Sequence, residues 1–140
     1  GNKQDVGKRL AAWALNKEYG KSDMVYSGPL FKDMKIKADK VTISFEQLGS
    51  GLMIAAKAPR KLLEPPVELK GGTLARFAIA GADKKWFWAE AEIIEDKVVL
   101  SSPHVKTPVA IRYAFSHHPQ GCNLYNKEGF PASPFRTDDW

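Results

Sequence analysis

The stretch GGTLARFAIAGADKKWFWAEAEIIEDKVVLSSPHVKTPVAIRYAF, residues 71–115, decides the fold class of this chain. Within it, Phe77 and Ile79 fall on one side of an extended strand, and Ala78 and Ala80 fall on the other. This period-two alternation is typical of a half-buried β-strand. The sequence therefore predicts a strand at the start of the stretch, with one face turned to a core.

The same alternation continues through the rest of the stretch. Gly81 to Asp83 has turn composition, and after it Trp86 and Trp88 lie on the face opposite to Phe87. Short strands joined by short turns predict an antiparallel sheet. The predicted strands are residues 74–80, 86–94, 97–100 and 109–115.

Length and composition predict one domain with a core of its own. A chain of 140 residues buries roughly two thirds of its unfolded surface. The apolar content of 44% and the aromatic content of 11% agree with this, and the single Cys122 excludes an intramolecular disulfide. No segment approaches the ~20 apolar residues of a membrane span, and the first residues are too polar for a signal peptide.

The net charge of +5 raises the question of nucleic-acid binding. The lysines are not clustered, however: Lys32, Lys35 and Lys37 alternate with Asp33 and apolar residues, as on the solvated face of a hairpin. We therefore expect neither a nucleic-acid nor a membrane partner.

Residues 2–19 form the one convincing helix of the sequence. Val6, Leu10, Trp13 and Ala14 follow a helical stripe, and Gly20 stands where a left-handed C-terminal cap belongs. A stripe that contains a tryptophan has to bury itself against something. The helix is therefore expected to dock on its own domain, to dock on a partner, or to fray.

The remaining segments favour an all-β fold. Residues 34–38 and 41–45 predict a hairpin, residues 52–56 another strand, and residues 58–68, with three prolines, an irregular connection. Residues 117–140 lack periodicity and are expected to wrap as an ordered tail held by aromatic side chains, or to fray. Together these segments predict a jelly-roll-like antiparallel β-sandwich of about eight short strands with one N-terminal helix.

Four motifs stand out in the second half of the chain: VVLSSP at 98–103, PVAIRYAF at 108–115, NLYN at 123–126 and GFPASPFRTDDW at 129–140. Together they resemble the C-terminal block of bacterial sialate O-acetylesterases, the sialic acid-specific 9-O-acetylesterases of the SGNH-type esterase family. The N-terminal segment NKQDVGKRLA, residues 2–11, is similar to the helix that closes the catalytic domain of that family. Phe115 stands where the family commonly has Trp, and Phe130 where it commonly has Leu.

The resemblance implies a division of the chain and a role for it. Residues 1–20 would be the helix that closes a catalytic domain not contained in this sequence, and residues 21–140 an accessory β-sandwich with an irregular tail. In the family, a serine in a Gly-Asp-Ser-like turn attacks the acetyl ester, and an Asp-x-x-His-Pro segment supplies the base. Neither element occurs here. The resemblance further implies a periplasmic or secreted bacterial parent enzyme of carbohydrate metabolism that needs no metal or organic cofactor.

Independent catalysis is not expected of this chain. Ser101, Ser102, His104 and Asp138 contain the atoms of a hydrolytic triad, but the sequence has no G-x-S-x-G nucleophile turn. Ser-Ser-Pro at the end of a strand is ordinarily a turn. We therefore predict no catalytic residues, and an esterase activity only in the parent enzyme that the chain resembles.

A metal site is not expected either. His117, His118 and Cys122 lie close together in the sequence, but a structural zinc needs four ligands and a catalytic zinc three. Adjacent side chains on an extended segment also point in opposite directions. A solvated loop explains these residues better.

Trp86 and Trp88 admit two interpretations. They could form a stacking platform for a sugar together with Tyr113, with Arg112, Lys84 and Lys85 pairing with the carboxylate of a sialic acid. They could instead be core residues, buried under the tail or the helix, and this is the favoured interpretation because aromatic side chains dominate sandwich interiors. Trp86, Trp88, Tyr113 and Arg112 are the candidate substrate-binding residues.

The sequence thus favours a non-catalytic accessory domain of a sialate O-acetylesterase. Its expected partners are the catalytic domain of the parent chain, a glycan that carries sialic acid, and a second copy of the chain bound through the N-terminal helix. The alternatives are a free-standing carbohydrate-binding module and a plain interaction domain. Exposed tryptophans on one sheet would favour the carbohydrate-binding module, whereas a functional surface where the helix and the tail meet the missing catalytic domain would favour the accessory domain.

Overall fold

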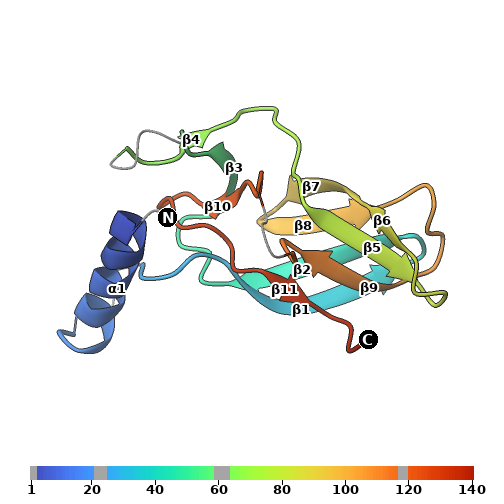
Figure 1. Ribbon diagram of the computed structural model, residues 1–140, viewed down its shortest axis with the longest axis horizontal. Helices are drawn as coiled ribbons and strands as arrows, with labels where there is room; N and C mark the ends of the chain where they lie inside the picture. The colour runs from blue at the N-terminus through green and yellow to red at the C-terminus, as the bar shows by residue number, and fades with distance from the viewer. Residues whose placement is uncertain (1–2, 21–24, 59–63, 117–119) are drawn as a thin grey trace.

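A computed structural model describes residues 3–20, 25–58, 64–116 and 120–140 (Figure 1). In this described part the chain forms a single helix and otherwise short strands, in accordance with the predicted all-β class. The elements are α1 (Lys3–Lys17), β1 (Leu30–Lys37), β2 (Lys40–Glu46), β3 (Leu52–Ala56), β4 (Val67–Glu68), β5 (Phe77–Gly81), β6 (Trp86–Trp88), β7 (Glu90–Ile94), β8 (Lys97–Ser101), β9 (Pro108–Tyr113), β10 (Leu124–Asn126) and β11 (Phe135–Arg136).

Two four-stranded antiparallel sheets face each other and enclose the core. One has the strand order β1-β2-β8-β7 and the other β11-β9-β5-β6 (Figure 1). Phe135 joins them, because its ring lies 4.8 Å from that of Phe31 and 6.0 Å from that of Phe45. The fold is therefore a β-sandwich, as predicted. Its buried centre is formed by Val41, Ile43, Phe45, Phe77, Ile79, Val98, Leu100, Ile111 and Tyr113.

The predicted strand over residues 86–94 is wrong in one respect. It is two strands that belong to different sheets: β6 pairs with β5, and β7 pairs with β8. The chain passes from one sheet to the other at Ala89, whose backbone N–H donates to the Phe77 carbonyl at 3.0 Å. Side-chain alternation continues through this crossing, so the period-two pattern did not reveal it.

Three short strands were not predicted. β4 lies within the proline-rich connection, and β10 and β11 lie in the tail that was expected to be irregular. β3 pairs with β4 and β10 in a small third sheet, and β11 pairs with β9. Strands of two or three residues are too short to show alternation, and outside β10 and β11 the described tail contains no helix or strand.

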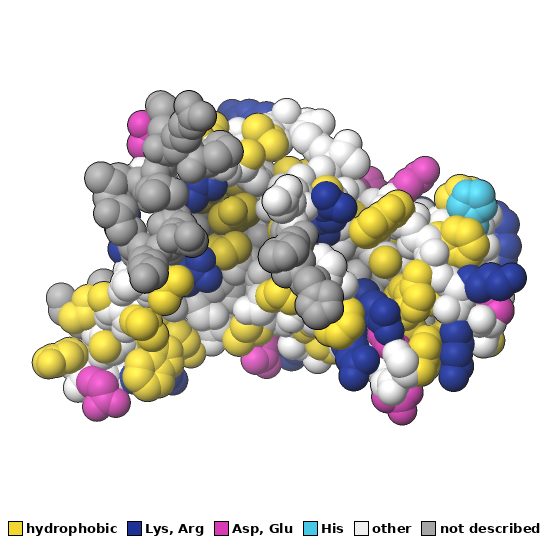
Figure 2. Space-filling view, viewed as in Figure 1, with side chains coloured by type: hydrophobic (Ala, Val, Ile, Leu, Met, Phe, Trp, Pro, Cys, Tyr) yellow, Lys and Arg dark blue, Asp and Glu magenta, His cyan; other side chains and the backbone are white. Residues whose placement is uncertain are grey.

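The helix α1 lies at one end of the molecule with its apolar stripe uncovered. Val6 is 53% exposed, Leu10 65% and Trp13 48%, and hydrophobic side chains stand out at this end in Figure 2. Gly20 has the left-handed φ of 68° that was predicted for the C-terminal cap. The proposed boundary between residues 20 and 21 borders residues 21–24, which lie outside the described part.

Candidate functional site

A groove with a volume of about 720 Å³ opens on the outer face of the sheet β11-β9-β5-β6. Basic and aromatic side chains line it, and none of its lining residues carries a carboxylate. Figure 2 shows hydrophobic side chains interleaved with Lys and Arg at the end of the molecule opposite to α1. We call it the tryptophan groove, and its residues are Arg76, Ala78, Trp86, Phe87, Trp88, His104, Arg112, Ala114, Phe115 and Ser116.

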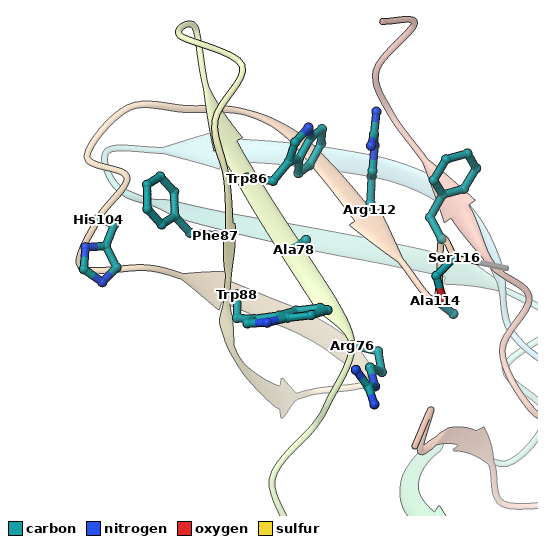
Figure 3. Close-up of a pocket in the computed structure, with 10 residues that line it drawn as sticks. Arg76, Ala78, Trp86, Phe87, Trp88, His104, Arg112, Ala114 and Ser116 are labelled. Carbon is teal, nitrogen blue, oxygen red and sulfur yellow. The ribbon is translucent and has the colours of Figure 1, made fainter. Parts of the chain in front are cut away.

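The register of three strands explains why the groove is hollow. Trp88 of β6 is opposite Ala78 of β5, which is opposite Arg112 of β9, so these three residues share one face of the sheet. The small side chain of Ala78 leaves open space between the indole of Trp88 and the guanidinium of Arg112. Figure 3 shows Ala78 between the side chains of Trp88 and Arg112, and all three residues line the groove.

The two tryptophans differ in exposure. Trp88 is 67% exposed, whereas Trp86 is half-buried beneath the guanidinium of Arg112, whose carbon lies 4.1 Å from the ring centroid. The ring of Trp140 lies 6.4 Å from that of Trp86. The favoured interpretation of both tryptophans as core residues is therefore wrong for Trp88, because its face of the sheet carries no covering layer in the described part.

Arg112 is held rigidly by the C-terminal tail. Its Nε donates to Oδ1 of Asp138 at 2.9 Å, its Nη2 donates to Oδ2 at 2.5 Å, and Nη2 also donates to the carbonyl of Trp140 at 2.8 Å. This hydrogen bonding holds the pKa of the buried Asp138 carboxyl below its usual value and raises that of Arg112. Arg112 is thus a structural support of Trp86, and its charge is already balanced by Asp138.

Tyr113 does not belong to the groove. It follows Arg112 on β9 and so points to the opposite face, where it is fully buried with its ring 4.4 Å from that of Phe77. Its hydroxyl accepts a hydrogen bond from the N–H of Leu124 at 3.3 Å, and burial raises its pKa above the usual value. The predicted platform of Trp86, Trp88 and Tyr113 is therefore not formed. Because side chains alternate along β9, the neighbours Arg112 and Tyr113 cannot lie on the same face of the sheet.

Arg76, Phe115 and His104 line the groove and were not predicted as site residues. Arg76 lies over Trp88 at 5.7 Å, and His104 stacks on Phe87 at 5.0 Å. Arg76 shares its side of the predicted strand with Ala78, and this was the available signal. Lys84 stacks instead over Trp140 at 4.9 Å, and neither Lys84 nor Lys85 lines the groove.

The residues considered for catalysis are engaged in other contacts. Ser102 is buried, and its hydroxyl accepts a hydrogen bond from the backbone N–H of His104 at 3.4 Å, while the imidazole of His104 stacks on Phe87. Asp138 binds Arg112. Within the described ranges these three residues make no triad.

His117 and His118, considered and set aside as metal ligands, lie outside the described residues. Over the ranges that are described, no three His, Cys, Asp or Glu side chains gather as a metal site. The described helix is not long and apolar enough to span a membrane.

Comparison with known proteins relates the chain to a solved enzyme structure. No protein-family model and no curated protein matches the chain. Among solved structures, a carbohydrate acetylesterase from Xanthomonas citri is similar, with 39% sequence identity and a TM-score of 0.83 over 99% of this chain. The match spans only 29% of the length of that protein. The chain is therefore similar, along nearly its whole length, to one region of a carbohydrate acetylesterase.

Proposed function

We propose that this chain is a non-catalytic accessory region of a carbohydrate O-acetylesterase, and that its parent enzyme removes acetyl groups from sialic acids. The observation that carries the proposal is the asymmetry of the match to the Xanthomonas citri acetylesterase: 99% of this chain corresponds to 29% of that one. The narrower assignment to sialic acid rests on the motifs near residues 98–140 that resemble sialate O-acetylesterases.

The surroundings of Ser102 and His104, which were considered as catalytic residues, support a non-catalytic role. A serine nucleophile needs an exposed oxygen, an oriented base and donors for the oxyanion. Ser102 is 3% exposed, and the imidazole beside it is stacked rather than hydrogen-bonded to the hydroxyl. The chemistry is therefore assigned to the remainder of the parent chain.

The helix α1 supplies the contact to that remainder. Its stripe of Val6, Leu10 and Trp13 is exposed, and an isolated helix of its length is marginal in water unless an apolar face is covered. Packing against the catalytic domain would cover that stripe. A contact with the catalytic domain through α1 would leave the tryptophan groove free at the other end of the sandwich.

A second candidate is a free-standing carbohydrate-binding module. The 67% exposure of Trp88 favours it, because a flat exposed indole is suited to stacking on a sugar ring. The two candidates differ in where hydrolysis occurs. Only an accessory region needs a covalently or tightly associated esterase.

Acetate release tests the proposal. The complete reading frame that contains this chain would be assayed on 9-O-acetylated N-acetylneuraminic acid and on an O-acetylated neutral oligosaccharide, beside this chain alone. We expect release from the sialic acid by the complete protein only. A complete protein without esterase activity would favour the binding module, and hydrolysis of the neutral substrate alone would refute the assignment to sialic acid.

The resemblance also predicts a periplasmic or secreted parent protein. Fractionation of the producing bacterium, with detection by an antibody against this chain, would test that prediction. Detection confined to the cytoplasm would contradict it.

A further inference from the structure

Arg76 is the guanidinium of the tryptophan groove that has no acidic partner within the described chain. Arg112, by contrast, donates hydrogen bonds to the carboxylate of Asp138 and to the carbonyl of Trp140. Arg76 uses its Nε to donate to the carbonyl of Gln120 at 2.5 Å, and no described carboxylate forms an ion pair with it. Its terminal nitrogens therefore offer a charged donor pair to an anion from outside.

The backbone holds Arg76 in an unusual conformation at this point. Its φ is 68°, and its carbonyl accepts a hydrogen bond at 3.1 Å from the N–H of Ala114, whose φ is 53°. Left-handed backbone is uncommon for residues other than glycine and tends to cluster where a side chain has a task. Here the paired turns before β5 and after β9 direct the Arg76 side chain over the indole of Trp88, as Figure 3 shows.

The two side chains together define the chemistry of a ligand. Trp88 presents a broad apolar ring, and Arg76 presents a positive charge over that ring, with its guanidinium carbon 5.7 Å from the ring centroid. A pyranose offers a face of C–H groups to an indole, and a carboxylate matches the two-pronged geometry of a guanidinium. The groove volume of about 720 Å³ falls within the usual range for small-ligand sites.

We propose that Trp88 and Arg76 bind an acidic sugar, with the ring stacked on Trp88 and the carboxylate paired with Arg76. The inference deepens the proposed function and rests on it in taking the ligand to be a carbohydrate. The charge of the groove favours this class over neutral sugars, because its lining residues include two arginines and no carboxylate, and only one arginine is neutralised.

The test is a pair of sugars that differ only at one carbon. Binding of methyl β-glucuronide and of methyl β-glucoside to this chain would be followed by tryptophan fluorescence and by calorimetry. We expect the glucuronide to bind about 10-fold more tightly, because hydrogen bonds to a charged group are the stronger ones. Rising salt would weaken the glucuronide more than the glucoside.

Variants separate the contribution of charge from that of the ring. Arg76→Asn, chosen because Asn tolerates a positive φ, should weaken the glucuronide about 10-fold and change the glucoside less than about 2-fold. Trp88→Ala should abolish binding of both. Arg9→Asn on α1 removes the same charge far from the groove and should change neither affinity. Thermal unfolding of each variant checks that it is folded.

Four outcomes would overturn the inference. Equal affinity for both sugars, or glucuronide binding that Arg76→Asn leaves unchanged, would refute anion recognition and leave the proposed function to the acetate assay. No binding of either sugar would also refute it, and the acetate assay would then judge the proposed function separately. Binding by this chain but not by the complete protein would show that another part of the complete protein covers the groove, so that it is not a sugar site there.

Discussion

Replacing Asp138 with Asn should weaken the contact between the end of the C-terminal tail and Arg112. Asp138 is 8% exposed and accepts two hydrogen bonds from Arg112, at 2.9 and 2.5 Å. Hydrogen bonds to charged groups contribute about 1.5 to 3 kcal/mol, and the partial exposure of Arg112 reduces that benefit. We expect Asp138→Asn to lower the free energy of unfolding by about 2 kcal/mol, and the melting temperature by about 8 °C.

Urea unfolding followed by tryptophan fluorescence measures this loss. The emission of Trp86 should change in the folded state as well, because Arg112 lies 4.1 Å from its ring only while Asp138 holds it. Asp139→Asn is the matched control, since Asp139 is exposed and forms none of these hydrogen bonds. A loss below about 0.5 kcal/mol for Asp138→Asn, or an equal loss for Asp139→Asn, would refute this account of the tail.

The same contact predicts a pH dependence. The pKa of Asp138 is lowered in the folded state, so its contribution to stability is present above the ordinary value of 3.8. It is lost as the pH falls through the lower folded value. The difference in unfolding free energy between the unsubstituted chain and Asp138→Asn should therefore be constant near neutral pH and vanish in acid. A difference that persists in acid would contradict the ion pair as its source.

Further predictions concern the helix, the core and one tight contact. The exposed stripe of α1 should associate, so sedimentation across about a hundredfold range of concentration should show mass rising for this chain and not for Trp13→Asp; constant mass for both would refute it. Burial raises the pKa of Tyr113, so its hydroxyl should resist ionisation above about pH 10 until the protein unfolds. The free energy of unfolding should therefore fall as the pH rises past the pKa of tyrosine in the unfolded chain, and an ordinary titration in the folded protein would contradict the burial. A Cβ at Gly28 would overlap the backbone carbonyl of Pro131, so Gly28→Ala should lower the free energy of unfolding by about 2 to 4 kcal/mol in chemical denaturation. Gly7→Ala, with open space around the new Cβ, should be neutral or stabilising, and equal effects of the two changes would refute the close approach at Gly28.

Alternation and turn residues predicted the sandwich because its core strands are long enough to show a period of two. β2, β5, β8 and β9 all carry buried residues at alternate positions. β4, β10 and β11 span two or three residues, and their pairing depends on distant strands rather than on local pattern. The crossing at Ala89 escaped prediction for a related reason, since a change of sheet does not interrupt alternation.

The candidate site was predicted in part for reasons that the register explains. Trp86, Trp88 and Arg112 come together because they share one face of β6, β5 and β9. Tyr113 lies outside the groove although its neighbour Arg112 lines it, because adjacent residues of a strand cannot share a face. The contribution of Arg76 depends on a left-handed backbone and on a contact with Gln120, and neither follows from its place in the sequence.

One NMR titration tests the central claim that this chain binds a glycan and leaves the chemistry to its parent enzyme. The probe is the methyl glycoside of 9-O-acetylated N-acetylneuraminic acid, whose acetyl methyl signal reports hydrolysis while the indole N–H signal of Trp88 reports binding. We predict that the indole signal shifts with added glycoside and that the acetyl signal stays intact beside a control with a matched inert protein. Release of free acetate by this chain alone, abolished by Ser102→Ala or His104→Ala, would contradict the claim.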